Sequence, residues 1–140
     1  MTEPFYTPYD QIEVGQRAEL EVTLTEDEVN RFSALIGDTN SFHVSDEAAA
    51  ITPFKNRICH GVHLLAYVSV AIGQKLPGFG TIYCSHEFDF YAPVYLGHGI
   101  KVSLTVREKL PHRRLKISTD IIRDDGTLVM SGQAVVKTYR

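Results

Sequence analysis

A carboxylate and an imidazole lie five residues apart in a short polar segment: Asp38 and His43, with Asn40 between them. A carboxylate accepts protons, and an imidazole with an ordinary pKa of about 6.5 can donate or accept one near neutral pH. If both side chains face one small molecule, they form a general acid–base pair. The alternative is an ordinary loop in which Asp38 caps a helix and His43 is satisfied by its neighbours.

A second candidate feature is Cys59-His60-Gly61, which precedes an apolar run. The first amides of a helix have no partner within the helix, and glycine lets a ligand carbonyl approach the backbone closely. The Gly61 amide, with His60 beside it, is therefore a candidate oxyanion-hole donor. The alternative is a helix start whose glycine serves packing alone.

Two helices should flank the polar segment. Thr25 and Glu28 can form a capping box before apolar residues at helical spacing, which predicts a helix over about 26–36, ended by Gly37. Ser45 should cap a short second helix that stops before Pro53. The intervening residues 38–44 are expected to be a loop.

The rest of the chain reads as one long helix and a series of strands. The helix expected over 61–72 is apolar on nearly every side, so it should be buried, and Gly73 should close it. Alternating residues predict one strand before the first helix, over 13–24, and several after residue 81. Asp124-Asp125-Gly126 predicts a hairpin turn, and Gly132 a bulge. These elements predict an α+β fold with an antiparallel sheet wrapped around a central hydrophobic helix, in a single domain of residues 1–140.

Composition excludes several classes of protein. The net charge of -3, without a clustered basic face, gives no reason to expect a nucleic-acid partner. The most apolar stretch, 61–73, is shorter than the roughly 20 residues of a membrane span. Cys59 and Cys84 allow at most one disulfide, and residues 1–10 lack the apolar core of a secretory signal. Reduced thiols in a cytoplasmic protein are expected.

Five motifs in this order and spacing resemble the MaoC-like (R)-specific enoyl-CoA hydratase/dehydratase family, from about Gln11 to Lys137. They are Asp38-Xaa-Asn40-Xaa-Xaa-His43, His60-Gly61 before a helix that contains Ser69, Leu76-Pro77-Gly78, Phe90-Xaa-Xaa-Pro93-Val94, and Gly97. The resemblance implies a hot-dog fold and a homodimer or dimer-based oligomer. It also implies an acyl-CoA or acyl carrier protein thioester as substrate, at or near the subunit interface.

The implied activity is that of a hydro-lyase: hydration of a trans-2-enoyl-CoA to an (R)-3-hydroxyacyl-CoA, or the reverse dehydration. By this resemblance Asp38 and His43 hold the catalytic water, and the Gly61 amide polarises the thioester carbonyl. Asn40 supports the loop, and His60 and Ser69 lie beside the site. No metal or organic cofactor is implied.

Four alternatives remain open at the level of sequence. A hot-dog acyl-CoA thioesterase would carry its acid on or near the central helix, which here has no Asp or Glu after Gly61. A non-catalytic acyl-thioester-binding subunit would not need an acid–base pair. A metal site could use Asp38, His43, His60 and His63, and Cys59 could act as a nucleophile beside His60.

His63 departs from the family, which usually has an apolar residue there. It could enter the acyl pocket, or be a core histidine bonded to a backbone carbonyl.

Overall fold

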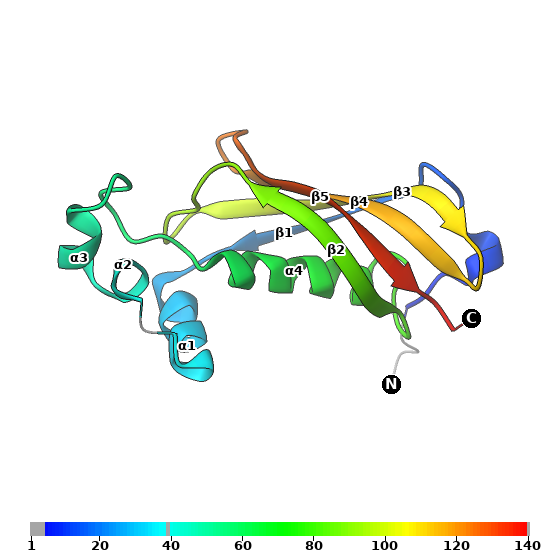
Figure 1. Ribbon diagram of the computed structural model, residues 1–140, viewed down its shortest axis with the longest axis horizontal. Coiled ribbons are helices and arrows are strands. Elements are labelled where there is room, and N and C mark those ends of the chain that lie inside the picture. The colour runs from blue at the N-terminus through cyan, green and yellow to red at the C-terminus, as the bar shows by residue number, and fades with distance from the viewer. Residues whose placement is uncertain (1–4, 39, 140) are drawn as a thin grey trace.

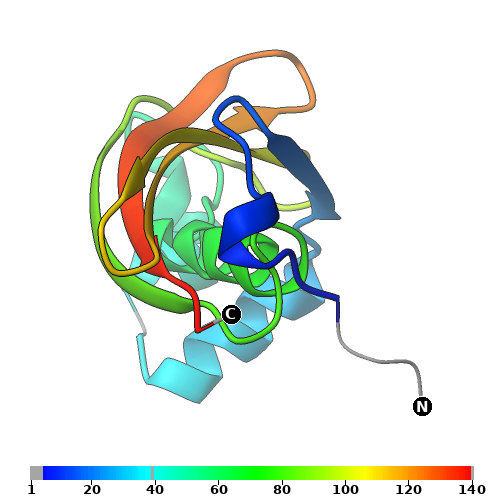
Figure 2. The ribbon, with the colours of Figure 1, turned by 90° about the vertical axis from the view of Figure 1, so that its right-hand side faces the viewer.

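A five-stranded antiparallel sheet curves around one long helix in the computed structural model of the chain, which describes residues 5–38 and 40–139. Residues 1–4 of the segment expected to lack a secretory signal lie outside these ranges. Figure 1 shows the sheet above helix α4 (Gly61–Gln74), and the view along the sheet in Figure 2 shows α4 in its hollow. The α+β class expected from the sequence is confirmed.

The strands follow the order β1-β3-β4-β5-β2, so the first two strands in sequence form the two edges. Their bounds are Arg17–Thr23 (β1), Ile82–Phe90 (β2), Gly99–Leu110 (β3), Arg114–Arg123 (β4) and Leu128–Lys137 (β5). The hairpin turn at 124–126 joins β4 to β5 as expected, with Gly126 at a φ of 87°. Alternation along each strand gives the sheet one apolar face, which lies against α4.

The core lies between this face and α4. The helix contributes Leu64, Val68, Ala71 and Ile72, all buried. The facing side chains of the sheet include Val102, Leu104, Ile117, Ile121, Met130 and Val136. Each of these side chains larger than alanine contributes about 1.5–3 kcal/mol by leaving water. This packing fixes the position of α4 on the sheet.

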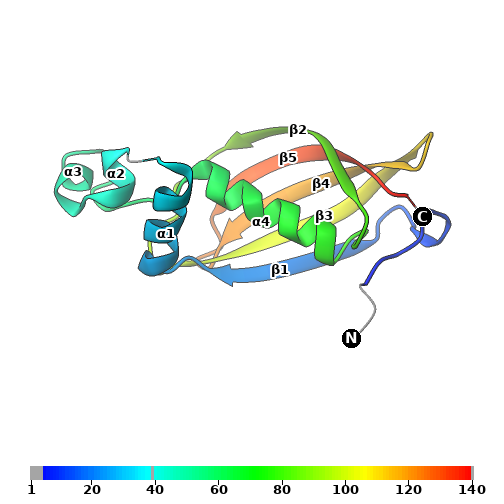
Figure 3. The same cartoon turned by 90° about the horizontal axis from the view of Figure 1, so that it is seen from below.

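The opposite face of α4 is open in the single chain, contrary to the expectation of a helix buried all round. Val62 is 57% exposed, and Ala66 and Ser69 are exposed on the same side. In Figure 3, seen from below, α4 lies in front of the sheet with no labelled element over it. The helix also continues past Gly73 to Gln74, because a single glycine weakens a packed helix without ending it.

Three short helices precede α4: α1 (Glu26–Ile36), α2 (Ser41–Val44) and α3 (Asp46–Ala50), after a 3₁₀ turn at Tyr9–Gln11. Both predicted N-caps form, with the hydroxyl oxygens of Thr25 and Ser45 accepting from backbone amides at 3.2 Å. The capping box at α1 is incomplete, because the Glu28 carboxylate accepts from the Tyr67 hydroxyl instead. The predicted loop over 38–44 is wrong in its second half, since α2 forms there.

Two further predictions about the sheet need correction. The strand expected over 13–24 begins at Arg17, because the chain turns at Gly15, whose φ is 92°. Gly132 is paired without interruption on both sides, and the register shifts lie elsewhere in the sheet. A Cβ at Gly132 would lie 2.1 Å from the carbonyl oxygen of Glu87, so close backbone approach requires this glycine. Among the described residues, no helix is long and apolar enough to cross a membrane.

Candidate active site

Asp38 is placed by the end of α1. Gly37 adopts the left-handed conformation that terminates the helix, with a φ of 73°, and Asp38 is the next residue. The Asn40 amide donates to Asp38 Oδ1 at 3.0 Å, a local turn of the kind aspartate favours. Asn40 therefore supports the carboxylate through its main chain.

His43 lies on α2 and is buried. Its Nδ1 is 2.7 Å from the carbonyl oxygen of Ile58. A carbonyl oxygen can only accept, so Nδ1 carries the proton and donates. In the neutral ring this leaves Nε2 as the acceptor, which is the form a general base requires.

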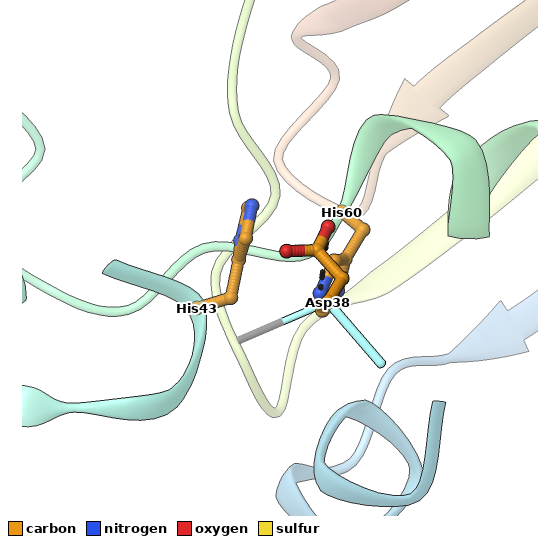
Figure 4. Close-up of side chains that lie close together, drawn as sticks. All are labelled: Asp38, His43 and His60. Carbon is orange, nitrogen blue, oxygen red and sulfur yellow. Dashed lines mark ion pairs between the residues drawn. The ribbon is translucent and has the colours of Figure 1, made fainter. Parts of the chain in front are cut away.

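His60 is the N-cap residue of α4 and is 1% exposed. Its Nε2 lies 3.0 Å from Ser33 Oγ and 3.6 Å from Asp38 Oδ2, and its ring stacks on His43 with centroids 4.0 Å apart. Figure 4 shows the Asp38 carboxylate beside His60, with its oxygens directed toward the side on which His43 lies. Three side chains from three segments therefore meet at the beginning of α4.

Ser33 was not identified from the sequence. It is one of two buried residues of α1 and lies four positions after Val29, so both belong to the same helical face. A polar residue on an otherwise apolar stripe must find a partner when buried. The place of Ser33 on this stripe was therefore the signal that the sequence offered for a buried polar contact. The partner in the structure is His60.

Burial lowers the pKa of His60, and the neighbouring His43 lowers it further, against the smaller opposing effect of Asp38. His60 is therefore neutral at neutral pH. A neutral imidazole contacts the Asp38 carboxylate without forming a full ion pair.

Gly61 begins α4, and its N-cap residue makes no side-chain hydrogen bond to the helix. In the described part of the chain, the Gly61 amide donates to no backbone carbonyl. A Cβ at this position would lie 2.9 Å from Phe90 Cζ, so only glycine admits the ring this close. Gly61 thus lies beside an apolar wall, and within residues 5–38 and 40–139 no backbone carbonyl occupies its amide.

An apolar cleft of about 360 Å³ reaches both His43 and Gly61. Its remaining lining is Phe54, Ile58, Cys59, Leu64, Phe90, Tyr91, Ala92, Pro93 and Val94. Two larger hollows, of about 520 and 460 Å³, lie elsewhere and contain neither residue. The smaller cleft is the one lined by both the His43 imidazole and Gly61, and an apolar cleft with a few polar groups at its wall is typical of a binding site.

The profile of the MaoC like domain matches residues 9–125. The chain belongs to this family. A 3-hydroxybutyryl-CoA dehydratase from Methylorubrum extorquens is 34% identical over 129 residues, covering 92% of this chain and 82% of that protein. An (R)-specific enoyl-CoA hydratase from Aeromonas caviae is 38% identical over 129 residues, covering 90% and 95%. The unliganded R-hydratase PhaJ1 from Pseudomonas aeruginosa superimposes with a TM-score of 0.90 at 41% identity, covering 95% of this chain and 86% of that chain.

The fold of this MaoC-like protein is accordingly the hot-dog fold, with α4 as the central helix. The architecture and the family expected from the sequence are both confirmed. Of the expected site residues, the structure brings together Asp38, His43, His60 and Gly61. Ser69 does not join them within one chain: it is exposed and eight residues beyond Gly61, about 12 Å along the helix axis at 1.5 Å per residue.

His63 of the MaoC-like chain is a core histidine and does not line the cleft. Its Nε2 is 3.1 Å from Glu28 Oε2, and its ring stacks on Phe32 at 4.2 Å. The expected partner, a backbone carbonyl, was wrong. Helix α1 supplies a carboxylate instead, and this could not be read from the residues around His63.

The polar cluster also contains candidate metal ligands. Asp38, His43 and His60 each offer one ligand atom, all within 4.8 Å of one another. The imidazoles of His43 and His60 are stacked 22° from parallel, however, and their lone pairs lie in the ring planes. Such lone pairs do not converge on one ion unless a ring turns, and His60 Nε2 already contacts Ser33.

Cys59 is a poor nucleophile in this fold. Burial raises the pKa of its thiol to about 12, with the Glu28 carboxylate adding to the effect. The reactive species is the thiolate, which such a pKa suppresses near neutrality.

Proposed function

We propose that this MaoC-like protein hydrates trans-2-enoyl-CoA to (R)-3-hydroxyacyl-CoA, and catalyses the reverse dehydration, with Asp38 and His43 as the catalytic pair. The protein is a hydro-lyase by its relatives at 34–41% identity over most of the chain. The observation that supports the catalytic assignment is that Asp38 and His43 bring their polar atoms within 4.8 Å of each other at the beginning of α4, and that His43 and Gly61 line one cleft.

The mechanism begins with a water molecule held between the Asp38 carboxylate and His43 Nε2. Because Ile58 fixes the proton on Nδ1, Nε2 orients the water by accepting from it. Asp38 takes a proton as the water oxygen attacks C3 of the enoyl thioester. One member of the pair then returns a proton to C2. Positioned acid–base transfer of this kind typically contributes about 10²–10⁴-fold.

Attack at C3 requires the thioester carbonyl oxygen to take up negative charge. The Gly61 amide is the proposed donor to that oxygen, assisted by the positive end of the α4 dipole. Removing a single donor of this type costs about 2.7–4 kcal/mol in other enzymes. The proposed reaction needs no metal or organic cofactor.

Asn40 and His60 hold the carboxylate in this proposal. The Asn40 amide fixes Asp38 Oδ1, and the neutral His60, bonded to Ser33, packs against Oδ2. Each contact restricts the rotation of the carboxyl group, so that its oxygens keep a constant direction toward the water.

The functional unit in this proposal is a homodimer. Apolar side chains are exposed on the open face of α4 and also on the edge strand β2 and just beyond it, among them Ile82, Phe90 and Tyr91. Phe90 and Tyr91 also line the cleft, so a second subunit on this face would complete its wall and bring Ser69 to the interface. Sedimentation of the purified protein tests the dimer. A monomer at micromolar concentration would contradict it.

The proposed carrier of the acyl group is coenzyme A. Acyl carrier protein is the alternative carrier, because it presents the acyl group on the same phosphopantetheine arm.

A cytoplasmic location is also part of the proposal, because the two cysteines are free in the structure.

A hydration assay tests the proposal and separates it from thioester hydrolysis. Incubation with crotonyl-CoA should remove the absorbance of the conjugated thioester and give (R)-3-hydroxybutyryl-CoA, with no free thiol released. Release of free coenzyme A without loss of the double bond would identify a thioesterase instead. Formation of the (S) product would contradict the proposed stereochemistry.

A further inference from the structure

Arg57 is a buried cation in the loop between α3 and α4. Its side chain is 6% exposed, whereas its neighbours Lys55 and Asn56 are exposed. A guanidinium removed from water is costly unless acceptors surround it. Each of its three nitrogens finds one acceptor here, and these acceptors lie on two helices near the catalytic cluster.

The first acceptor is the main chain of His43, whose carbonyl oxygen lies 2.8 Å from Arg57 Nε. The other two belong to α1: Nη1 forms an ion pair with Glu26 Oε1 at 3.0 Å, and Nη2 donates to Asn30 Oδ1. The planar guanidinium fixes the directions of all three bonds. Arg57 thereby ties the end of α2 to the first two turns of α1.

The residue after Arg57 holds His43 as well. The Ile58 carbonyl accepts from His43 Nδ1 at 2.7 Å, and the Ile58 amide donates to the carbonyl of Phe42 at 3.3 Å. Two consecutive residues therefore hold His43, Arg57 at its main chain and Ile58 at its ring. Displacing this dipeptide would move the carbonyl that fixes the proton on Nδ1.

We propose that Arg57 is a positioning residue for catalysis, which keeps the His43 imidazole in its Nδ1-protonated form with Nε2 aimed at the catalytic water. This inference rests on the proposed hydratase function and deepens it. Arg57 does not line the cleft that reaches His43 and Gly61, and the separate hollow of about 460 Å³ that it does line contains neither residue. Its effect on the reaction is therefore transmitted through His43. Its loss should therefore lower kcat while leaving KM nearly constant.

The test compares Arg57→Met, Arg57→Lys and Glu26→Gln in the full-length protein. Methionine keeps an apolar stem and removes all three donors, whereas lysine keeps the charge but cannot reach three acceptors. Because displacements of about 1 Å can cost about 10²-fold in rate, kcat for crotonyl-CoA should fall about 10–100-fold in Arg57→Met and less in Arg57→Lys. Glu26 is 68% exposed, and its amide variant leaves the bond to the His43 carbonyl in place, so its kcat should stay close to that of the wild type.

A second readout is independent of turnover. The two ring ¹⁵N resonances of His43 should report an Nδ1-protonated ring in the wild type and in Glu26→Gln, and a mixture of tautomers in Arg57→Met. The inference is overturned if the folded Arg57 variants keep both the wild-type kcat and the wild-type tautomer, or if Glu26→Gln loses as much rate as Arg57→Met. If Arg57→Met does not fold, Arg57→Lys decides by the same two measurements. If the wild type hydrates no enoyl thioester, the proposed function fails, and the tautomer comparison still decides the positioning role.

Discussion

The imidazoles of His43 and His60 stack with their centroids 4.0 Å apart and their planes 22° from parallel. Two imidazolium rings at this distance would repel, and burial already lowers the pKa of His60. His60 is therefore neutral at neutral pH. A neutral His60 suits a carboxylate base, because it does not form a full ion pair with Asp38, whose Oδ2 lies 3.6 Å from its Nε2.

Asp38→Asn should lower kcat for crotonyl-CoA hydration about 10²–10⁴-fold, because the amide keeps the shape of the carboxyl group but cannot take a proton. His43→Gln should reduce kcat in the same range. Steady-state kinetics checks this, with circular dichroism to confirm folding. The matched control is Asp27→Asn, an exposed acid of α1 whose contact is with Arg31 on the surface, and its kcat should be unchanged. A folded Asp38→Asn variant with wild-type kcat would refute the role of the carboxylate and would favour a binding module.

Acidification should destabilise the protein below about pH 6.5. Burial lowers the pKa of His60, His63 and His86 in the folded chain, so between the folded and unfolded pKa values the unfolded state binds more protons. The part of the free energy of unfolding that depends on these neutral histidines is fully present above the unfolded pKa of about 6.5. It is lost as the pH falls toward the lower pKa values of the folded state. Urea unfolding between about pH 7.5 and 5 measures this. A free energy of unfolding that stays constant or rises on acidification would contradict it.

Gly61→Ala should impair the cleft, because the new Cβ would lie 2.9 Å from Phe90 Cζ and 3.0 Å from Cε2. The ring of Phe90 is half-exposed and can shift, so the fold should survive while kcat/KM falls. Gly73→Ala is the control on the same helix, where a Cβ meets nothing within 4 Å. Alanine there should raise stability by about 0.5–1 kcal/mol and leave kinetics unchanged. Equal kinetic losses in both variants would mean that the helix matters and the Gly61 site does not.

His63→Leu should destabilise the fold without changing substrate preference. Glu28 Oε2 is buried and accepts no hydrogen bond from the described residues, so the imidazole 3.1 Å away is the polar neighbour that the substitution would replace with an apolar side chain. Leaving the oxygen against that side chain should cost about 1–3 kcal/mol. Because His63 does not line the cleft, the ratio of rates for short and long enoyl-CoA substrates should match that of the wild type. Thermal unfolding and a chain-length series measure the two effects. A shifted chain-length preference would place His63 in the acyl site after all.

Cysteine alkylation should be selective in the native protein. Burial raises the pKa of the Cys59 thiol to about 12, whereas Cys84 is exposed on β2. Iodoacetamide at mildly alkaline pH should therefore modify Cys84 and spare Cys59 until the protein is unfolded. Peptide mapping by mass spectrometry identifies the site. Alkylation of native Cys59 at a rate comparable to Cys84 would show that its thiol is accessible and ionised.

The sequence by itself determined the fold class, the family and the segments that carry the polar residues. Alternation marks the strands, the caps at Thr25 and Ser45 mark helix starts, and both kinds of signal act between near neighbours. The same locality explains why Asp38, His43 and Gly61 could be selected as candidates: their residue types and spacing are visible without any knowledge of packing.

Tertiary structure decided which of these residues meet and what supports them. The Ser33–His60 bond joins residues 27 positions apart, the Arg57–Glu26 pair spans 31, and Glu28 reaches Tyr67 across 39. Such contacts depend on how α1 packs beside the beginning of α4, which no local pattern encodes. The open face of α4 has the same origin, because an all-round apolar helix indicates that it must be covered but does not specify whether its own chain or a second subunit covers it.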